Sequence, residues 1–186
     1  MELKKESRML KDDIEEILID EEKIISRCKD LGKQINRDYH GEQLIMVALL
    51  KGSVPFLAEL LKNIELVIEV DFLDVSSYEG TESTGEINIR KDLDRSIRGK
   101  EILIVEDIVD TGRTLETVKK YLYNKGAKRV CVATLLDKKS RRVVAVDAEY
   151  VGFDIPDYFV VGFGLDYNQK YRNLPFIGVL KKELYS

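Results

Sequence analysis

Continuous apolar runs and helically spaced apolar residues alternate along the chain. A run that no polar residue interrupts is typical of a strand buried on both faces. Such runs fall within residues 44–50, 101–107 and 129–137. Apolar residues spaced three and four apart predict amphipathic helices instead, and these fall at residues 21–39, 56–62 and 113–124. Asp20 is placed to cap the first helix, and Gly126 lies where the third should end.

Buried strands that alternate with helices predict an α/β fold with a mainly parallel central sheet. Two more strands are expected at 66–78 and 86–93. Between them, residues 79–86 ("EGTESTGE") are polar, contain two glycines and show no periodicity, which predicts a mobile loop. Short strands with Gly and Pro breaks follow towards the C-terminus. No repeat or linker separates two domains, so residues 1–186 are predicted to form a single domain.

The composition excludes several classes of function. The hydrophobic fraction of 44% and the charged fraction of 34% are those of a soluble globule, and a net charge of −4 argues against a general nucleic-acid binder. No apolar run approaches the ~20 residues of a membrane span. The N-terminal residues lack the apolar core of a signal peptide, so the cytoplasm is the expected location.

The chain has little material for a zinc site, because it contains one histidine and two cysteines, Cys28 and Cys131. Cys131 lies in the apolar run "VCVATLL" and is expected to be a buried thiol. Any metal is therefore expected to be a hard cation held by carboxylates.

A dense polar cluster lies at the end of the strand expected at 101–107. Within nine positions the sequence places Glu106, Asp107, Asp110, Thr111, Gly112 and Thr114. Ligands of open α/β sheets bind beyond the carboxyl ends of strands, and a turn at a helix N-terminus attracts anions. A phosphate in this turn beside paired carboxylates indicates a phosphorylated sugar. The simpler alternative makes Asp110 a helix N-cap and the acidic pair a solvated strand end. Neither a Walker A loop nor a Rossmann fingerprint is present.

The segment "ILIVEDIVDTGRTL" resembles the phosphoribosyl-diphosphate motif of type I phosphoribosyltransferases. The segments "LLKGS", "SSYEGTESTGEI", "LLDKK" and "VGFDIPDYFVVGFGLDYNQKYRNLPFIGVL" are similar to the 6-oxopurine branch, the hypoxanthine-guanine phosphoribosyltransferases. Order and spacing agree from about residue 44 to the C-terminus. The resemblance implies a mainly parallel central sheet flanked by helices, with a small hood lobe formed from the chain termini.

The resemblance implies the transfer of a 5-phosphoribosyl group from phosphoribosyl diphosphate to N9 of a 6-oxopurine, with release of pyrophosphate. Glu106 and Asp107 would bind the ribose hydroxyls, in part through Mg²⁺. The 5-phosphate would be bound by Asp110, Thr111, Gly112, Arg113 and Thr114. Asp110 has a second implied role at the purine, either as a general base or as an electrostatic stabiliser. Many relatives carry Lys in place of Arg113.

The remaining implied sites bind pyrophosphate and the purine. Pyrophosphate would be bound by Lys51, Gly52 and Arg172, with a cis bond before Lys51. The purine subsite would consist of Lys138 at the 6-oxygen, Phe159 stacking on the base, Val160 through its backbone, and Asp166. Asp166 would also bind a second Mg²⁺, which makes Glu106, Asp107 and Asp166 the implied metal ligands. Residues 76–87 would form a lid that excludes water from the reacting groups, and Ser77 and Tyr78 would lie near its start.

The sequence therefore predicts a Mg²⁺-dependent hypoxanthine(-guanine) phosphoribosyltransferase of purine salvage. Its partners would be small-molecule substrates and further copies of the chain, in a homodimer or homotetramer, without nucleic acid or membrane. A xanthine-preferring or broader 6-oxopurine enzyme is the alternative within the fold. A receiver-type signalling module is disfavoured by the D-T-G-x-T turn. A non-catalytic regulator that binds nucleic acid is disfavoured by the retention of Asp110 and Lys138.

Overall fold

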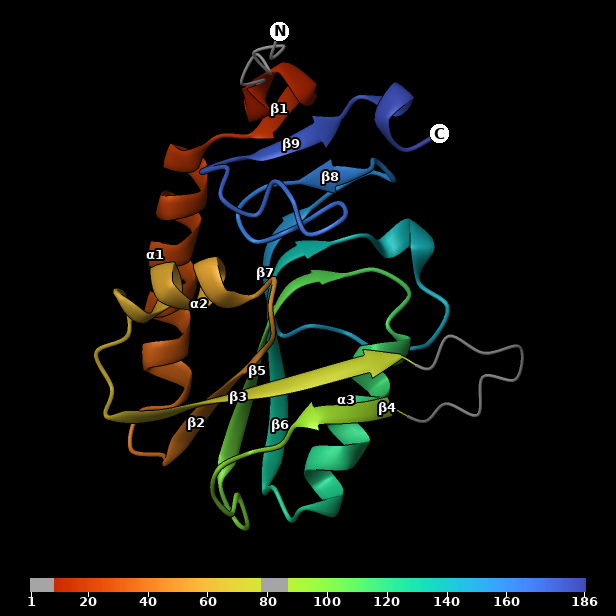
Figure 1. The fold of residues 1–186 in the computed structure, drawn as a ribbon. Coiled ribbons are helices and arrows are strands. Elements are labelled where there is room, and N and C mark those ends of the chain that lie inside the picture. The colour runs from red at the N-terminus through yellow and green to blue at the C-terminus, as the bar shows by residue number, and fades with distance from the viewer. Residues whose placement is uncertain (1–8, 78–86) are drawn as a thin grey trace, which may run out of the picture.

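Two sheets organise the chain in the computed structural model, which describes residues 9–77 and 87–186 (Figure 1). In the larger sheet the strand order is β4-β3-β2-β5-β6-β7. All neighbours in it pair in parallel except β3 and β4, which are antiparallel. The strands are β2 (Leu44–Leu49), β3 (Ile68–Ser77), β4 (Ile87–Lys91), β5 (Glu101–Val109), β6 (Arg129–Asp137) and β7 (Tyr150–Asp154). The predicted mainly parallel α/β sheet is confirmed.

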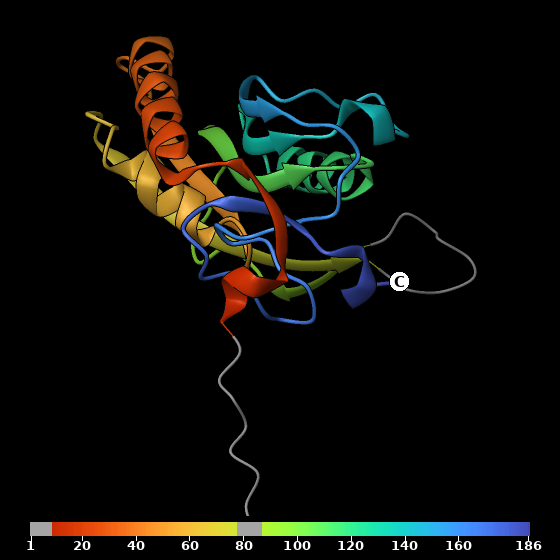
Figure 2. The same cartoon turned by 90° about the horizontal axis from the view of Figure 1, so that it is seen from above.

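Helices cover both faces of this sheet, as Figures 1 and 2 show. The helices are α1 (Glu21–Asp38), α2 (Val54–Leu61) and α3 (Arg113–Asn124). One apolar core joins α1 and α2 to one face of β2, β5 and β6. A second core joins α3 to the opposite face of the same strands. Burial on both faces explains why β2 is apolar at every position.

A small antiparallel sheet forms the hood lobe. Its strands are β1 (Ile14–Ile19), β9 (Ile177–Leu180) and β8 (Val160–Val161), in that order. Because β1 comes from the start of the chain and β9 from its end, the hood is built from the two termini, as the resemblance implied. The short 3₁₀ turns are η1 (Leu10–Asp13), η2 (Lys139–Arg141) and η3 (Lys182–Leu184).

Most predicted boundaries are confirmed, and two details differ. Both α3 and β6 match their predicted ranges, and Asp20 caps α1 by accepting from the Lys23 N–H at 2.8 Å. Ile25 is one of the apolar residues in the helix predicted at 21–39, but its side chain is 43% exposed. Strand β5 does not stop at residue 107, because its ladder with β6 continues to Val109. The acidic pair thus lies inside the last part of the strand.

Some predictions fall outside the described part of the chain. The loop expected at 79–86 and the lid residue Tyr78 lie there, while Ser77 is the last residue of β3. Within residues 9–77 and 87–186, no helix combines the length and the apolar character needed to cross a bilayer.

The two thiols are expected to be unreactive in the folded protein. Both Cys28 and Cys131 are free and buried, and burial, followed by the negative charge of Glu59, raises the pKa of the Cys28 thiol to about 12. At about pH 8 an aromatic disulfide reagent should label neither cysteine within minutes, and both once urea unfolds the chain. Ser26→Cys, at an exposed position of α1, supplies the fast-reacting control. Rapid labelling of the native wild type would contradict the buried placement.

Candidate active site

The turn between β5 and α3 forms a small polar cavity at the carboxyl edge of the sheet. The cavity has a volume of about 90 Å³ and is lined by Glu106, Ile108, Val109, Asp110, Thr111, Gly112, Thr114 and Leu115. A small polar cavity at a helix N-terminus suits a tetrahedral anion. The N-cap of α3 is Gly112, at φ +81°, so the alternative that Asp110 is only the cap is wrong. The Asp110 side chain is 41% exposed and borders this cavity.

The segment that follows β6 fixes the backbone of this turn. Val143 donates its N–H to the carbonyl of Thr111 at 3.0 Å. Arg142 donates from Nη1 to the carbonyl of Asp110 at 2.6 Å and pairs through Nη2 with the buried carboxylate of Asp137. Sequence reasoning missed Arg142, although the Arg-Arg pair directly after "LLDKKS" was a visible signal. The turn after β5 is thereby tied to the end of β6 and the segment that follows it.

Two neighbouring carboxylates dominate the electrostatics of the site. Burial, and then the negative charge of Asp107, raise the pKa of Glu106 well above its ordinary value. Burial also raises the pKa of Asp107 to about 6, although the Ile108 N–H at 2.8 Å and the charge of Arg172 act in the opposite direction. The charge of Asp166 adds a small upward contribution. A bound cation would relieve this repulsion, and the oxygen donors suit a hard divalent ion.

The loop between β2 and α2 touches both this acidic pair and the hood. The Leu50–Lys51 peptide bond is cis, as the resemblance implied. A Cβ atom on Gly52 would lie 1.6 Å from Asp107 Oδ2, and one on Gly164 would lie 1.9 Å from the Gly52 carbonyl oxygen. Only glycine permits these approaches, so the two lobes meet backbone to backbone at Gly52.

Arg172 joins the loop from the hood side. Its Nη1 donates to the carbonyl of Gly164 at 2.7 Å. A cavity of about 340 Å³ is lined by Lys51, Val54, Pro55, Gly164, Arg172 and Asn173. The residues predicted to bind pyrophosphate, Lys51, Gly52 and Arg172, are thus gathered from distant parts of the sequence.

The predicted purine residues lie on the next strand ends and in the hood. Lys138 follows β6 and is only 7% exposed, with its Nζ 3.8 Å from Asp157 Oδ1. Val160 begins β8. The Phe159 ring stacks on Tyr185 at a centroid distance of 4.4 Å and meets Tyr167 edge-on at 5.6 Å. Sequence reasoning missed Tyr185, which covers one face of the Phe159 ring.

The three predicted metal ligands do not meet as one centre. Asp166 Oδ1 pairs with Arg172 Nη2 at 2.8 Å, and Asp166 Oδ2 accepts from the Gln169 N–H at 2.8 Å. Among the residues that the structure describes, no three His, Cys, Asp or Glu side chains are grouped to hold a metal ion. A cation at Glu106 and Asp107 would need substrate oxygens or water to complete its shell, as Mg²⁺ commonly does.

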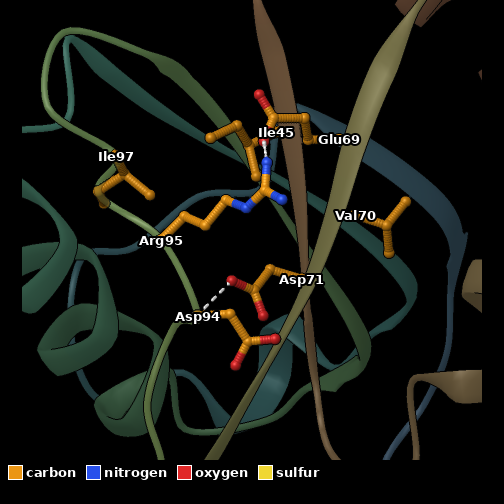
Figure 3. Close-up of a pocket in the computed structure, with 7 residues that line it drawn as sticks. All are labelled: Ile45, Glu69, Val70, Asp71, Asp94, Arg95 and Ile97. Atoms are coloured by element: carbon orange, nitrogen blue, oxygen red, sulfur yellow. Dashed lines mark hydrogen bonds and ion pairs between the residues drawn. The ribbon is translucent and has the colours of Figure 1, made fainter.

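A further cavity lies at the opposite, amino edge of the sheet (Figure 3). It has a volume of about 330 Å³ and is lined by Ile45, Glu69, Val70, Asp71, Asp94, Arg95 and Ile97. Its charged groups engage one another: the Asp94 N–H donates to Asp71 at 2.8 Å, and Arg95 lies 4.0 Å from Glu69. No predicted site residue borders it.

Comparisons with known proteins point to a single family. A family model described as a phosphoribosyl transferase domain matches residues 15–168. The hypoxanthine-guanine phosphoribosyltransferase of Streptococcus agalactiae is 52% identical over 179 residues, which cover 96% of this chain and 99% of that protein. The crystal structure of a hypoxanthine phosphoribosyltransferase from Staphylococcus aureus superposes with a TM-score of 0.93 at 49% identity, over 97% of this chain and 99% of that one.

The raised pKa of Asp107 predicts a pH-dependent effect of Asp107→Asn on stability. With a folded pKa of about 6 against an ordinary 3.8, the native state binds more protons between these values, so rising pH lowers the free energy of unfolding. In excess chelator at about pH 7.5, Asp107→Asn should therefore be more stable than wild type by about 1–3 kcal/mol.

Urea denaturation across the pH range tests this expectation. The difference between Asp107→Asn and wild type should shrink as the pH falls through about 6, and close below 3.8, where Asp107 is protonated in both the native and the unfolded state. Asp147→Asn, which neutralises an exposed carboxylate, should show no such closing gap. A variant less stable than wild type at about pH 7.5 would show that the Asp107 charge stabilises the free protein.

Proposed function

The chain belongs to the phosphoribosyl transferase family, and we propose that it transfers the 5-phosphoribosyl group of phosphoribosyl diphosphate to N9 of hypoxanthine and guanine, yielding IMP or GMP and pyrophosphate. One observation carries the proposal: the anion-sized turn after β5 shares one sheet edge with an acidic pair and with the buried ammonium of Lys138. The relatives named hypoxanthine-guanine phosphoribosyltransferase support it at 50–52% identity over nearly the whole chain. They do not favour a nucleic-acid regulator.

Each part of phosphoribosyl diphosphate has a matching group in the site. The helix N-terminus and the hydroxyls of Thr111 and Thr114 suit the 5-phosphate. Glu106 and Asp107 suit the ribose hydroxyls and hold Mg²⁺, whose charge, when it is bound, neutralises the leaving pyrophosphate. By resemblance to the family, the pyrophosphate is bound by Lys51, Gly52 and Arg172. Asp166 is the proposed ligand of a second Mg²⁺, although in the free protein it is paired with Arg172.

The purine is read from two directions. Lys138 donates to the 6-oxygen, and Phe159, which stacks on Tyr185 in the free protein, contributes an aromatic surface to the purine ring. Asp110 faces the imidazole edge, where it either accepts the departing proton or stabilises positive charge. Three points stay predictions. They are a lid over residues 76–87 that includes Ser77 and Tyr78, a location in the cytoplasm, and assembly into a homodimer or homotetramer.

Pyrophosphate release tests the function directly. With phosphoribosyl diphosphate and Mg²⁺, hypoxanthine and guanine should each support turnover, and xanthine less. Excess chelator should abolish turnover and added Mg²⁺ should restore it, because the candidate ligands are hard oxygen donors. Full turnover in chelator would remove the metal from the mechanism. No release with any 6-oxopurine would remove the function.

Asp110→Asn tests the role of the catalytic carboxylate. The amide keeps the size of the side chain but cannot take a full proton, so kcat should fall by roughly 10²–10⁴ with a modest change in KM. Asp147→Asn, the same change at an exposed position, should leave kcat within about twofold of wild type. A loss smaller than threefold in Asp110→Asn would mean that the carboxylate does not act on the purine.

Discrimination against adenine tests Lys138. An ammonium has donors only, so it pairs with a 6-oxygen but faces another donor in the 6-amino group of adenine. The kcat/KM for adenine should therefore lie at least ~10³ below that for hypoxanthine. Lys138→Gln should narrow the gap, mainly by weakening hypoxanthine, since its amide both donates and accepts. Adenine used within tenfold of hypoxanthine by wild type would show that Lys138 does not read the 6-oxygen.

A further inference from the structure

One oxygen of the Asp110 carboxylate is covered, while the rest of the side chain is open. Its Oδ1 atom is shielded from solvent, although 41% of the side chain is exposed. Arg141 Nε lies 2.9 Å from this oxygen. The contact is an ion pair without a well-aimed N–H, because the geometry does not meet that of a hydrogen bond. The exposed part of the carboxylate is therefore on the Oδ2 side.

Arg141 is held at this position by its neighbours. It ends η2, where its N–H donates to the carbonyl of Lys138 at 3.0 Å. The next residue, Arg142, is anchored to the carbonyl of Asp110. At the far end of the Arg141 guanidinium, Nη1 lies 3.5 Å from Asp157 Oδ1. The Arg141 guanidinium thus lies between the carboxylates of Asp110 and Asp157, at the edge of the proposed purine subsite.

A carboxylate that must meet a substrate at a fixed angle needs such a partner. The terminal torsion of an aspartate is broad, so a free carboxylate samples many orientations. Holding one oxygen restricts the other, as an orienting group does for a general base in other enzymes. We propose that Arg141 is a positioning residue, which holds Asp110 Oδ1 so that Oδ2 faces the purine. This inference rests on the proposed function, in which Asp110 acts on the base.

An ordinary surface ion pair on the same turn provides the comparison. Lys139 Nζ lies 2.9 Å from Asp154 Oδ1, with both side chains more than 60% exposed and neither in the predicted site. Lys139→Gln removes one positive charge from η2, as Arg141→Gln does. Any effect of net charge or of a loosened η2 turn should then appear in both variants. An effect that acts through Asp110 should appear only in Arg141→Gln.

The test compares Arg141→Gln, Arg141→Lys and Lys139→Gln in the wild-type and Asp110→Asn backgrounds. In wild type, Arg141→Gln should lower kcat about tenfold while KM for hypoxanthine changes less than threefold, since orientation is lost and not binding. Arg141→Lys should recover kcat to within about threefold. Lys139→Gln should stay within about twofold of wild type. In the Asp110→Asn background, Arg141→Gln should have less than a twofold effect, because there is no carboxylate left to orient.

A second readout does not depend on turnover. With ¹³C-labelled aspartate carboxyls, the Asp110 signal, identified by its loss in Asp110→Asn, should shift in Arg141→Gln and not in Lys139→Gln. A kcat within twofold of wild type, an equal loss in both backgrounds, or an unmoved Asp110 signal in Arg141→Gln would each overturn the proposal. If wild type releases no pyrophosphate while the signal shifts, the contact between Arg141 and Asp110 is real, but the proposed function has failed, and the positioning role of Arg141 fails with it.

Discussion

Two adjacent carboxylates inside the end of β5 impose the main constraint on this molecule. Burial raises the pKa of both Glu106 and Asp107, and the negative charge of Asp107 raises that of Glu106 further, so the free protein keeps an arrangement that opposes ionisation. A core built for stability alone would place apolar residues there, as the same strand does at the four preceding positions, 102–105. The unfavourable charges are explained once a cationic or hydroxyl-bearing ligand completes the site.

The contacts around this pair show how the two lobes are kept in register. Gly52 lies against Asp107 on one side and against Gly164 of the hood on the other, at distances that no Cβ atom allows. Arg172 supplies a positive charge that acts on Asp107 and is itself fixed by the carbonyl of Gly164. Because these contacts involve backbone atoms, a small displacement of the hood would directly change the surroundings of the acidic pair.

A second set of contacts links the turn after β5 to the segment after β6. The segment after β6 begins with Lys138, whose N–H donates to the carbonyl of Val109 at 2.9 Å. Farther along this segment, Arg141 pairs with the carboxylate of Asp110, and Arg142 donates to its backbone carbonyl. Lys138 and Asp110, which we propose read the base and act on it, are therefore held by one short stretch of chain. This arrangement fits a reaction that requires two substrates to meet at a defined geometry.

The sequence by itself determined the elements and the chemistry of each strand end. The ranges of α3 and β6 were predictable because apolar spacing and turn residues act locally, and the polar cluster at 106–114 was visible for the same reason. Only the tertiary structure decided that β5 continues to Val109, that Gly112 and not Asp110 caps α3, and that Tyr185 covers Phe159. It also decided the pairing of Arg141 with Asp110 and the raised pKa of Asp107. These features depend on burial and on contacts between segments distant in sequence, and no local pattern encodes either.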